Sequence, residues 1–449
     1  MADTVIVPIS PLADASTRPR NSASDSIPSI CVSSVSHESS LGIWFSASHS
    51  RRSACGVSST AEPNTAKTVI VSSVPAVRLL AARGAAITLV TFEKEADLRD
   101  VTAVANLEGD LSRAGVSWEP LRYHKTPKWP ATLLDAFLAL LQALRVRMRG
   151  RFDIVHARTF VSGPMGFVIA RLLGARFVYH NEGFYPDEQV DGGVWRRGSF
   201  VHRLARGVED FLYRNADGLV VLSDRARQDV VRRLGGHPIP PIIVVPSAVD
   251  LAAFQPGDDR NATSGPLSLV YLGSVGLRYR LDDAGRFVTA VRRLRPGSTL
   301  TVVSRADPQL VESMLDAAGL PREAWSRKEL PHADVPAELV RHDAGLFFLT
   351  EGLSEHGCSP TKIGEYWACG LPVVTTPNVS DTDRIVKEQR VGVVVTSKDG
   401  AARDHAARAL VELVGDPETK ARCRKAAETA YALDASCQRQ MRLYAELAP

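Results

Sequence analysis

Residues 359 to 376 read Ser359-Pro-Thr-Lys-Ile-Gly-Glu-Tyr-Trp-Ala-Cys-Gly-Leu-Pro-Val-Val-Thr-Thr376, and this stretch decides the fold. It predicts a helix with Ser359 as its N-cap and Pro360 as its first residue, where the missing N–H of proline is no loss. Gly370 ends this helix, and the apolar run after it predicts a buried strand. A short helix followed by a buried strand is typical of a parallel α/β layer.

The start of this helix also predicts an anion site. The free N–H groups of the first turn, beginning at Thr361, and the positive end of the helix dipole attract an anion such as a diphosphate. Lys362 is a cation in the same turn, where it opposes the dipole unless an anion lies nearby. Glu365 can accept two hydrogen bonds from a ribose diol. The alternative is an ordinary N-capped helix, because short motifs often match by chance.

The stretch resembles the donor-site segment of family 4 glycosyltransferases of the GT-B architecture, in the subgroup that reads Ser-Pro-Thr-Lys-x-x-Glu-Tyr. The resemblance covers roughly residues 68 to 449. It implies an α/β fold in which two Rossmann-like domains face each other across a cleft. It also implies transfer of a sugar from a nucleoside-diphosphate sugar to a hydroxyl of a glycan or lipid-linked saccharide, with retention of configuration.

The same resemblance implies that helix N–H groups and basic residues, rather than a metal ion, hold the diphosphate. The nearest Asp-x-Asp sequence is Asp381-Thr-Asp383, and an N-cap and turn explain it. We therefore expect neither a metal nor a cofactor.

The composition excludes several other classes of protein. The 449 residues allow two or three domains, and the net charge of +4 is too small and diffuse to indicate nucleic-acid binding. The six cysteines show no ligand spacing and predict free thiols in a reducing compartment. No signal peptide is evident, and the apolar stretch 131–144 is too short to span a bilayer. A soluble cytoplasmic protein is expected.

Alternating strands and helices predict two successive α/β units. The predicted plan is an N-terminal acceptor domain over 1–248, a linker over 249–266, a nucleotide-sugar domain over 267–428, and a final helix within 429–449. In relatives the last helix crosses back onto the N-terminal domain. Apolar strand cores lie at residues 87–92, 154–155, 177–179, 219–222, 242–245, 267–272, 299–303, 345–349, 371–375 and 392–395.

The N-terminal segment is read in two ways. Thr4 to Ile9 predicts a first buried strand, followed by a flexible Ser-rich insertion over 10–67. Alternatively, residues 1–66 are a disordered leader and the first strand is Thr68 to Ser72. In both cases the glycine pair that many relatives carry before the helix at Ala76 is absent.

Strand ends of the second unit carry candidate donor-binding residues, because ligands of open parallel sheets bind beyond the carboxyl ends of the strands. Gly273 and Ser274 allow close approach of the backbone, and Arg278 and Arg280 could clamp a diphosphate. Arg305 follows the next strand and could contact base or phosphate. The alternative is a glycine turn with solvated arginines.

Strand ends of the first unit carry candidate acceptor-side residues. His156 and His180 each end a strand, and the loop after His180 resembles the family segment Arg-Gly-Phe-Trp-x-Asp-Glu-x-Val-Asp-Gly-Gly. We predict His180 as a donor-sugar or acceptor contact, and His156, Asp187 and Glu188 on the acceptor side. Structural histidines and helix-capping carboxylates are the alternative. Asn181 and Glu182 stand where the family usually has an Asp or Met and an Arg, so any role of that Arg does not transfer.

The chain departs from the broader family at Gly357, where other members carry a first Glu eight positions before the ribose-binding Glu. Glu351 and Glu355 flank this position without the required spacing. The first acidic contact to the sugar is therefore lost or supplied from elsewhere.

Residues 196–214 mix basic side chains with apolar ones at helical spacing. They predict either an amphipathic helix that contacts an anionic membrane or one that packs on the sheet with a solvated basic face. Two other functions remain open on the sequence alone: a sugar-nucleotide epimerase or hydrolase on the same fold, and a catalytically silent subunit that binds a nucleotide sugar.

Overall fold

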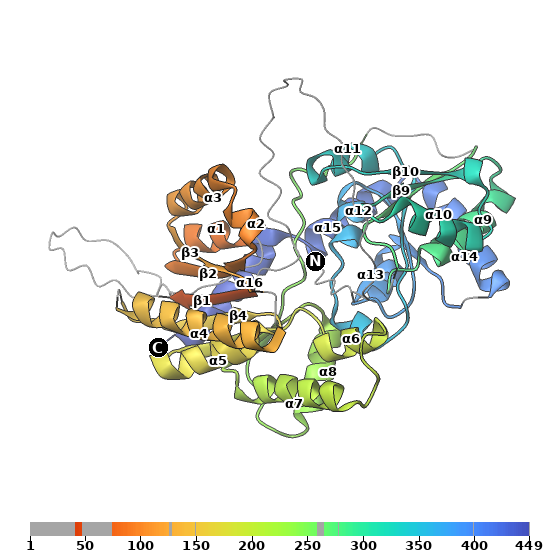
Figure 1. Ribbon diagram of the computed structural model, residues 1–449. Helices are drawn as coiled ribbons and strands as arrows, with labels where there is room; N and C mark the ends of the chain where they lie inside the picture. Colours follow the sequence, from red (N-terminus) through yellow and green to blue (C-terminus); the bar gives the residue numbers. More distant parts are fainter. Residues whose placement is uncertain are drawn as a thin grey trace, which may run out of the picture.

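The computed structural model describes residues 41–46, 74–124, 128–148, 150–257, 265–276, 278–397 and 399–448. Two α/β halves lie side by side, each with its own sheet covered by helices (Figure 1). The N-terminal half has one hydrophobic core, and the C-terminal half has a core on each face of its sheet.

The N-terminal sheet has seven strands in the order β3-β2-β1-β4-β5-β6-β7. Except at β1, neighbouring strands are parallel, as expected where helices cover both faces. The strands are β1 (Leu41–Ser46), β2 (Ile87–Glu93), β3 (Val116–Arg122), β4 (Ile154–Arg158), β5 (Arg176–His180), β6 (Gly218–Val221) and β7 (Ile242–Val244). The helices are α1 (Val74–Ala82), α2 (Glu95–Leu98), α3 (Val101–Arg113), α4 (Lys128–Arg147), α5 (Ser162–Leu173), α6 (Tyr185–Asp191), α7 (Phe200–Asn215) and α8 (Asp224–Leu234).

The central strand of this sheet corrects the sequence prediction. β1 lies between β2 and β4 and runs antiparallel to both. Its residues, Leu-Gly-Ile-Trp-Phe-Ser, were expected to be part of a flexible segment, but aromatic and β-branched side chains favour a strand. Both strands predicted from the sequence, 4–9 and 68–72, lie outside the described residues.

The C-terminal sheet is parallel throughout, in the order β10-β9-β8-β11-β12-β13. Its strands are β8 (Ser268–Leu272), β9 (Thr299–Val303), β10 (Trp325–Lys328), β11 (Ala344–Phe347), β12 (Val373–Thr375) and β13 (Gly392–Val394). Its helices are α9 (Leu281–Leu294), α10 (Pro308–Ala317), α11 (Val335–Leu339), α12 (Thr361–Ala368), α13 (Thr382–Gln389), α14 (Gly400–Gly415) and α15 (Thr419–Ala430), with short 3-10 turns η1 (Arg322–Ala324), η2 (His332–Asp334) and η3 (Ser354–Gly357).

The last helix, α16 (Leu433–Leu447), lies in the N-terminal half and packs on α1 (Figure 1). Leu443 and Tyr444 belong to the N-terminal core, where Leu443 approaches Gly218 of β6. Within residues 74–448, the described parts of the chain thus pass from the N-terminal half to the C-terminal half and back again.

Helix α12 begins one residue later than predicted. Thr361 is its first residue, and Pro360 holds the N-cap position with an extended backbone and no side-chain cap. Ser359 does not cap the helix, because its Oγ accepts the backbone N–H of Ser247, 3.0 Å away. The predicted end is confirmed: Gly370 adopts a left-handed φ of 79°, and the Leu371 N–H returns to the Tyr366 carbonyl.

Candidate active site

The first turn of α12 meets the loop that follows β8. Gly273 has φ 124°, and a Cβ placed on it would lie 3.1 Å from the Cε atom of Lys362. Only glycine therefore suits both the backbone and the space at this contact. Two segments predicted separately as donor-binding, Gly273 to Ser274 and Thr361 to Lys362, are adjacent in the folded protein.

Tyr366 fixes α12 against the ends of the strands. Its hydroxyl accepts the backbone N–H of Leu272 at 2.8 Å and lies 3.3 Å from the Leu346 carbonyl. Glu365 precedes it, is only 8% exposed, and forms no hydrogen bond through its carboxylate within the described part of the chain. A buried carboxylate normally has a partner, so Glu365 has capacity for a ligand diol.

Arg278 lies between two carboxylates from different halves. Its guanidinium is 3.3 Å from Glu188 of α6 and 3.4 Å from Glu355 of η3. Burial by itself lowers the pKa of Arg278, but the charges of Glu188 and Glu355 raise it above its ordinary value. Burial raises the pKa of Glu355, and Arg278 opposes that shift. The two carboxylates thus keep Arg278 positively charged although it is buried where the two halves meet.

Glu355 was not predicted as a site residue, because it lacks the spacing of the family's first Glu. The structure explains that absence. A Cβ at Gly357 would lie 3.0 Å from the Phe184 nitrogen and 3.1 Å from the Gly183 Cα, both in the N-terminal half. The backbones approach too closely for a side chain at position 357, and Glu355 supplies the acidic group nearby.

The positions of Arg280 and Arg305 give no support for the donor contacts that we predicted for them. Arg280 does not join Arg278, because its guanidinium makes two hydrogen bonds to Asp282 at the start of α9. It lines a separate cavity of about 380 Å³, together with Gly276, Tyr279, Asp282, Ser313, Met314, Ala317 and Thr350. Arg305 follows β9 and is exposed.

The predicted histidines lie next to each other beneath the strand ends. The ring centroids of His156 and His180 are 5.3 Å apart, and both side chains are buried. His156 lies in the middle of β4 and does not end it, and its Nδ1 is 2.8 Å from the hydroxyl of Tyr444 on α16. Its role on the acceptor side stays a prediction. Both nitrogens of His180 lack a partner among the described residues. Burial lowers the pKa of both histidines well below the ordinary value.

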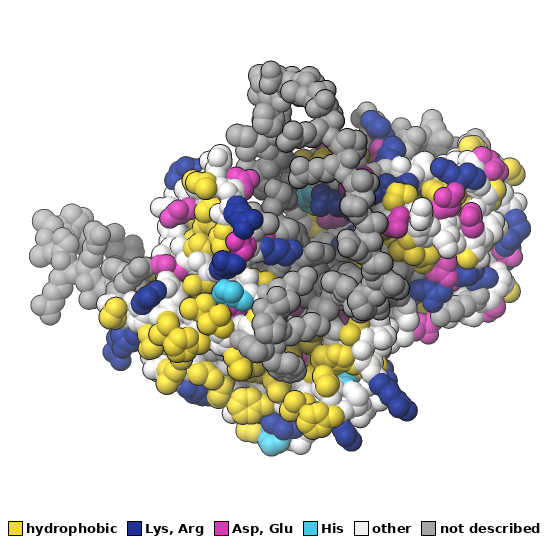
Figure 2. Space-filling model, in the orientation of Figure 1, with side chains coloured by type: hydrophobic (Ala, Val, Ile, Leu, Met, Phe, Trp, Pro, Cys, Tyr) yellow, Lys and Arg dark blue, Asp and Glu magenta, His cyan; other side chains and the backbone are white. Residues whose placement is uncertain are grey.

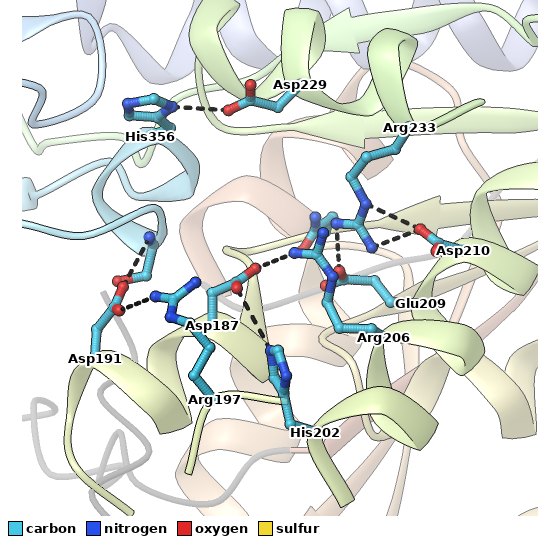
Figure 3. Close-up of polar contacts among 12 residues, drawn as sticks. Asp187, Asp191, Arg197, His202, Arg206, Glu209, Asp210, Asp229, Arg233 and His356 are labelled. Carbon is cyan, nitrogen blue, oxygen red and sulfur yellow. Dashed lines mark hydrogen bonds and ion pairs between the residues drawn. The ribbon is translucent and has the colours of Figure 1, made fainter. Parts of the chain in front are cut away.

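Asp187 has partners within the protein, and its contact with an acceptor stays a prediction. It is buried and forms an ion pair with Arg206 of α7, and its carboxylate lies 3.6 Å from His202 (Figure 3). Beside it, Arg233 of α8 contacts Glu209 at 2.6 Å, and burial raises the pKa of Glu209 to about 7. These ion pairs tie α6, α7 and α8 together and hold Glu188 in position.

A set of contacts joins the two halves, which we call the seam: Ser223, Asp224, Arg225 and Asp229 on one side and His356, Asp381 and Asp383 on the other. Asp381 accepts the backbone N–H groups of Asp224 at 2.9 Å and Arg225 at 3.3 Å. Asp381 therefore caps α8 of the other half, whereas the sequence predicted that it caps α13, the helix that follows it. Figure 3 shows one seam contact, between His356 Nδ1 and Asp229 at 2.8 Å.

Within the described ranges, no three His, Cys, Asp or Glu side chains are grouped as metal ligands would be. None of the helices in those ranges is long and apolar enough to cross a membrane.

Comparison with known proteins defines the class. Residues 73–248 match the family model described as "Glycosyl transferase 4-like domain", and residues 266–416 match "Glycosyl transferases group 1". The fold is similar to sucrose-phosphate synthase from Thermosynechococcus elongatus, with a TM-score of 0.55 at 16% identity over 73% of this chain and 83% of that one. It is also similar to HepE of Anabaena, solved in complex with UDP, with a TM-score of 0.55 at 13% identity over 75% and 88% of the two chains.

The chain is therefore a glycosyltransferase of the GT-B fold, with two Rossmann-like domains, as the sequence predicts. It is 26% identical over 304 residues to a glycogen synthase of Mycobacterium tuberculosis, covering 66% of this chain and 69% of that protein. It is 27% identical over 390 residues to a D-inositol 3-phosphate glycosyltransferase of Nocardiopsis dassonvillei, covering 78% and 82%.

Proposed function

We propose that the protein moves a sugar from a nucleoside-diphosphate sugar to a hydroxyl of a glycan or lipid-linked saccharide, with retention of configuration. The contact between Gly273 and Lys362 carries this proposal, because it joins a glycine loop to the first turn of α12. Backbone N–H groups, the helix dipole and a lysine there would all favour a diphosphate. We also propose that the chain falls in the Ser-Pro-Thr-Lys-x-x-Glu-Tyr subgroup.

Each site residue has a proposed role in this reaction. Lys362 and the N–H groups from Thr361 onward stabilise the leaving diphosphate, and Glu365 accepts hydrogen bonds from the ribose diol. Arg278 adds a buried positive charge, which Glu188 and Glu355 hold where the two halves meet. Preorganised charges of this kind stabilise a leaving group without the cost of reorienting water, so they would supply most of the catalysis.

His180 is the proposed contact to the donor sugar or the acceptor. Its two ring nitrogens have no partner in the described structure although the side chain is only 3% exposed. Such a group is costly to keep unless it serves a ligand.

The domain division follows from the same proposal. Residues 1–248 would supply the acceptor side, residues 267–428 the donor side, and residues 249–266 the connection between them. We further propose that the enzyme works on the inner face of a membrane when its acceptor is lipid-linked.

A uridine nucleotide is the first donor to test, because HepE was solved with UDP and with UDP-glucose. We expect a UDP- or GDP-linked sugar to raise the melting temperature, since a ligand that binds only the folded state stabilises it. Lys362→Ala should abolish most of that shift and lower transfer by roughly tenfold to a hundredfold, the worth of one hydrogen bond to a charged group. Glu365→Ala should act in the same direction.

Lys425→Ala is the matched control, because Lys425 is an exposed lysine on α15. It should bind and transfer like the wild type. If Lys362→Ala keeps the full ligand-induced shift and full transfer, the donor site lies elsewhere.

A further inference from the structure

Exposed apolar side chains gather on one face of the N-terminal half. Of the seventeen large hydrophobic side chains that are exposed in the described residues, eleven belong to α4, α5, α7 and the residue that follows α4. They are Leu133, Leu134, Phe137, Leu144, Met148, Val168, Leu172, Phe200, Val201, Leu204 and Phe211. We call this set the apolar face.

The apolar face is continuous across the three helices. α5 packs against both α4 and α7, so it lies between them. Phe167 of α5 and Phe211 of α7 meet edge to face, with ring centroids 5.0 Å apart. Figure 2 shows the hydrophobic surface spreading over the region of these helices, with Lys and Arg side chains near its edges.

Helix α4 carries apolar side chains on its solvent-facing side as well as on the side that packs on the core. Its inner side buries Ala139, Ala143 and Val146. Phe137, Leu144 and Met148 point away from that side and are 56%, 45% and 84% exposed. A surface helix of a globular protein normally has polar residues on its outer side, so a second apolar side requires another partner.

The exposed charged side chains described between residues 128 and 215, the stretch that holds α4, α5 and α7, are all positive. Between residues 128 and 215 all eight acidic side chains are buried or half-buried, as Asp135, Asp187 and Glu209 illustrate. Eight arginines in the same range are exposed: Arg145, Arg151, Arg171, Arg176, Arg196, Arg197, Arg203 and Arg214. An apolar surface bordered by arginines, without exposed carboxylates, is complementary to an anionic lipid surface.

We propose that the α4–α5–α7 face docks on an anionic membrane, with its apolar side chains among the acyl chains and its arginines at the lipid phosphates. A second copy of the chain fits this surface poorly, because a two-fold contact would bring two arginine-rich surfaces together. The proposal deepens the proposed function, on which its link to the acceptor rests.

The position of the face suits a lipid-linked acceptor. α7 begins with Phe200 and Val201, and it packs on α6. α6 carries Glu188, which contacts Arg278 of the other half. A membrane under α7 would therefore lie beside the segment that we assign to the acceptor side, and a long lipid could stay in the bilayer during transfer.

Vesicle flotation tests the proposal directly. The full chain should float with vesicles of phosphatidylglycerol and phosphatidylcholine, and bind much less to phosphatidylcholine alone or at high salt. The triple variant Phe137→Ser, Leu172→Ser, Leu204→Ser should lose at least roughly tenfold in partition, because each lost side chain removes apolar burial. A control triple variant, Val101→Ser, Ile239→Ser, Leu310→Ser, changes exposed apolar residues on other surfaces and should bind like the wild type.

The proposal fails if the wild type does not bind anionic vesicles, or if both triple variants bind equally. It also fails if sedimentation shows a wild-type dimer that the first triple variant abolishes, because a second copy would then occupy the face. Donor-induced thermal shifts should be equal in the wild type and the first variant. Loss of the thermal shift in the first variant alone would show that this variant does not fold correctly. Absence of the shift in the wild type and both variants would count against the proposed function.

Discussion

Lys362 is a cation at the end of a helix where the dipole is already positive. Gly273 lies against its side chain and has a backbone that other residues rarely adopt. A bound diphosphate would favour a lysine at this position, and the glycine lets the loop backbone approach the start of the helix. A charge that opposes the helix dipole is a feature expected at functional sites.

The buried histidines make stability depend on pH. Burial, the main cause, lowers the pKa of His156 and His180 in the folded state, whereas the unfolded chain has a value of about 6.5. Below that pH the unfolded state takes up protons that the folded state does not. Stability is therefore complete above about pH 6.5 and falls as the pH drops, by up to about 1.4 kcal/mol per pH unit for each histidine.

His180→Leu should consequently lose less stability than the wild type between pH 7 and pH 5. Glu209 has the opposite tendency, because its pKa is raised to about 7, but it contributes equally to both proteins. Urea denaturation at several pH values checks the difference. If the free energy of unfolding changes with pH in the same way in both proteins, His180 is not held neutral in the folded state. The same variant should lose transfer if His180 contacts substrate.

At the scale of elements, α12 shows what a sequence can and cannot predict. Its existence, its glycine end and the following strand were predictable, because propensity and spacing are local properties. The start of α12 was not predictable, because the hydroxyl of Ser359 accepts a hydrogen bond from the backbone of Ser247, a residue distant in sequence. The ion-pair partners of Asp187 and Arg280 could not be predicted either, because the sequence does not show whether a charged residue faces a ligand or another side chain.

The close packing of α12 on β11 predicts that a side chain at Gly345 destabilises the protein. A Cβ on this residue of β11 would overlap the ring of Tyr366. Gly345→Ala should therefore destabilise the protein by about 1–3 kcal/mol or more, and weaken donor binding by displacing the helix. Chemical denaturation with and without UDP measures both effects.

Gly415→Ala is the control, because no atom lies within 4 Å of a Cβ at that position in α14. It should be neutral or slightly stabilising. Equal stability of the two variants would mean that α12 is not packed as tightly as described.

At the scale of the whole molecule, the two-domain plan was predictable from the alternation of strands and helices, and the comparisons confirm the fold. The central strand was not, because Leu41 to Ser46 lies in a Ser-rich region whose composition suggested flexibility. The seam was also missed. His356 and Asp381 carry no sequence signal for contacts with the other half. Gly357 signals only the absence of the family's first Glu.

Asp381 links the two halves by capping α8 from the other side of the seam. Asp381→Ala should remove that cap, at a cost of about 0.5–2 kcal/mol, and loosen the connection between the halves. We expect a broader denaturation transition, because the two halves then unfold more independently.

Asp399→Ala is the matched control, since Asp399 caps α14 within one half by accepting the Ala402 N–H at 2.7 Å. It should lower stability without broadening the transition. If both variants broaden the transition equally, the seam does not couple the halves.

A crystal structure of the protein with UDP would show directly where the donor binds. We predict the diphosphate within hydrogen-bond distance of Lys362 Nζ and the first N–H groups of α12, with the ribose hydroxyls on Glu365. A diphosphate bound instead in the cavity beside Arg280 and Asp282, with the start of α12 unoccupied, would contradict it.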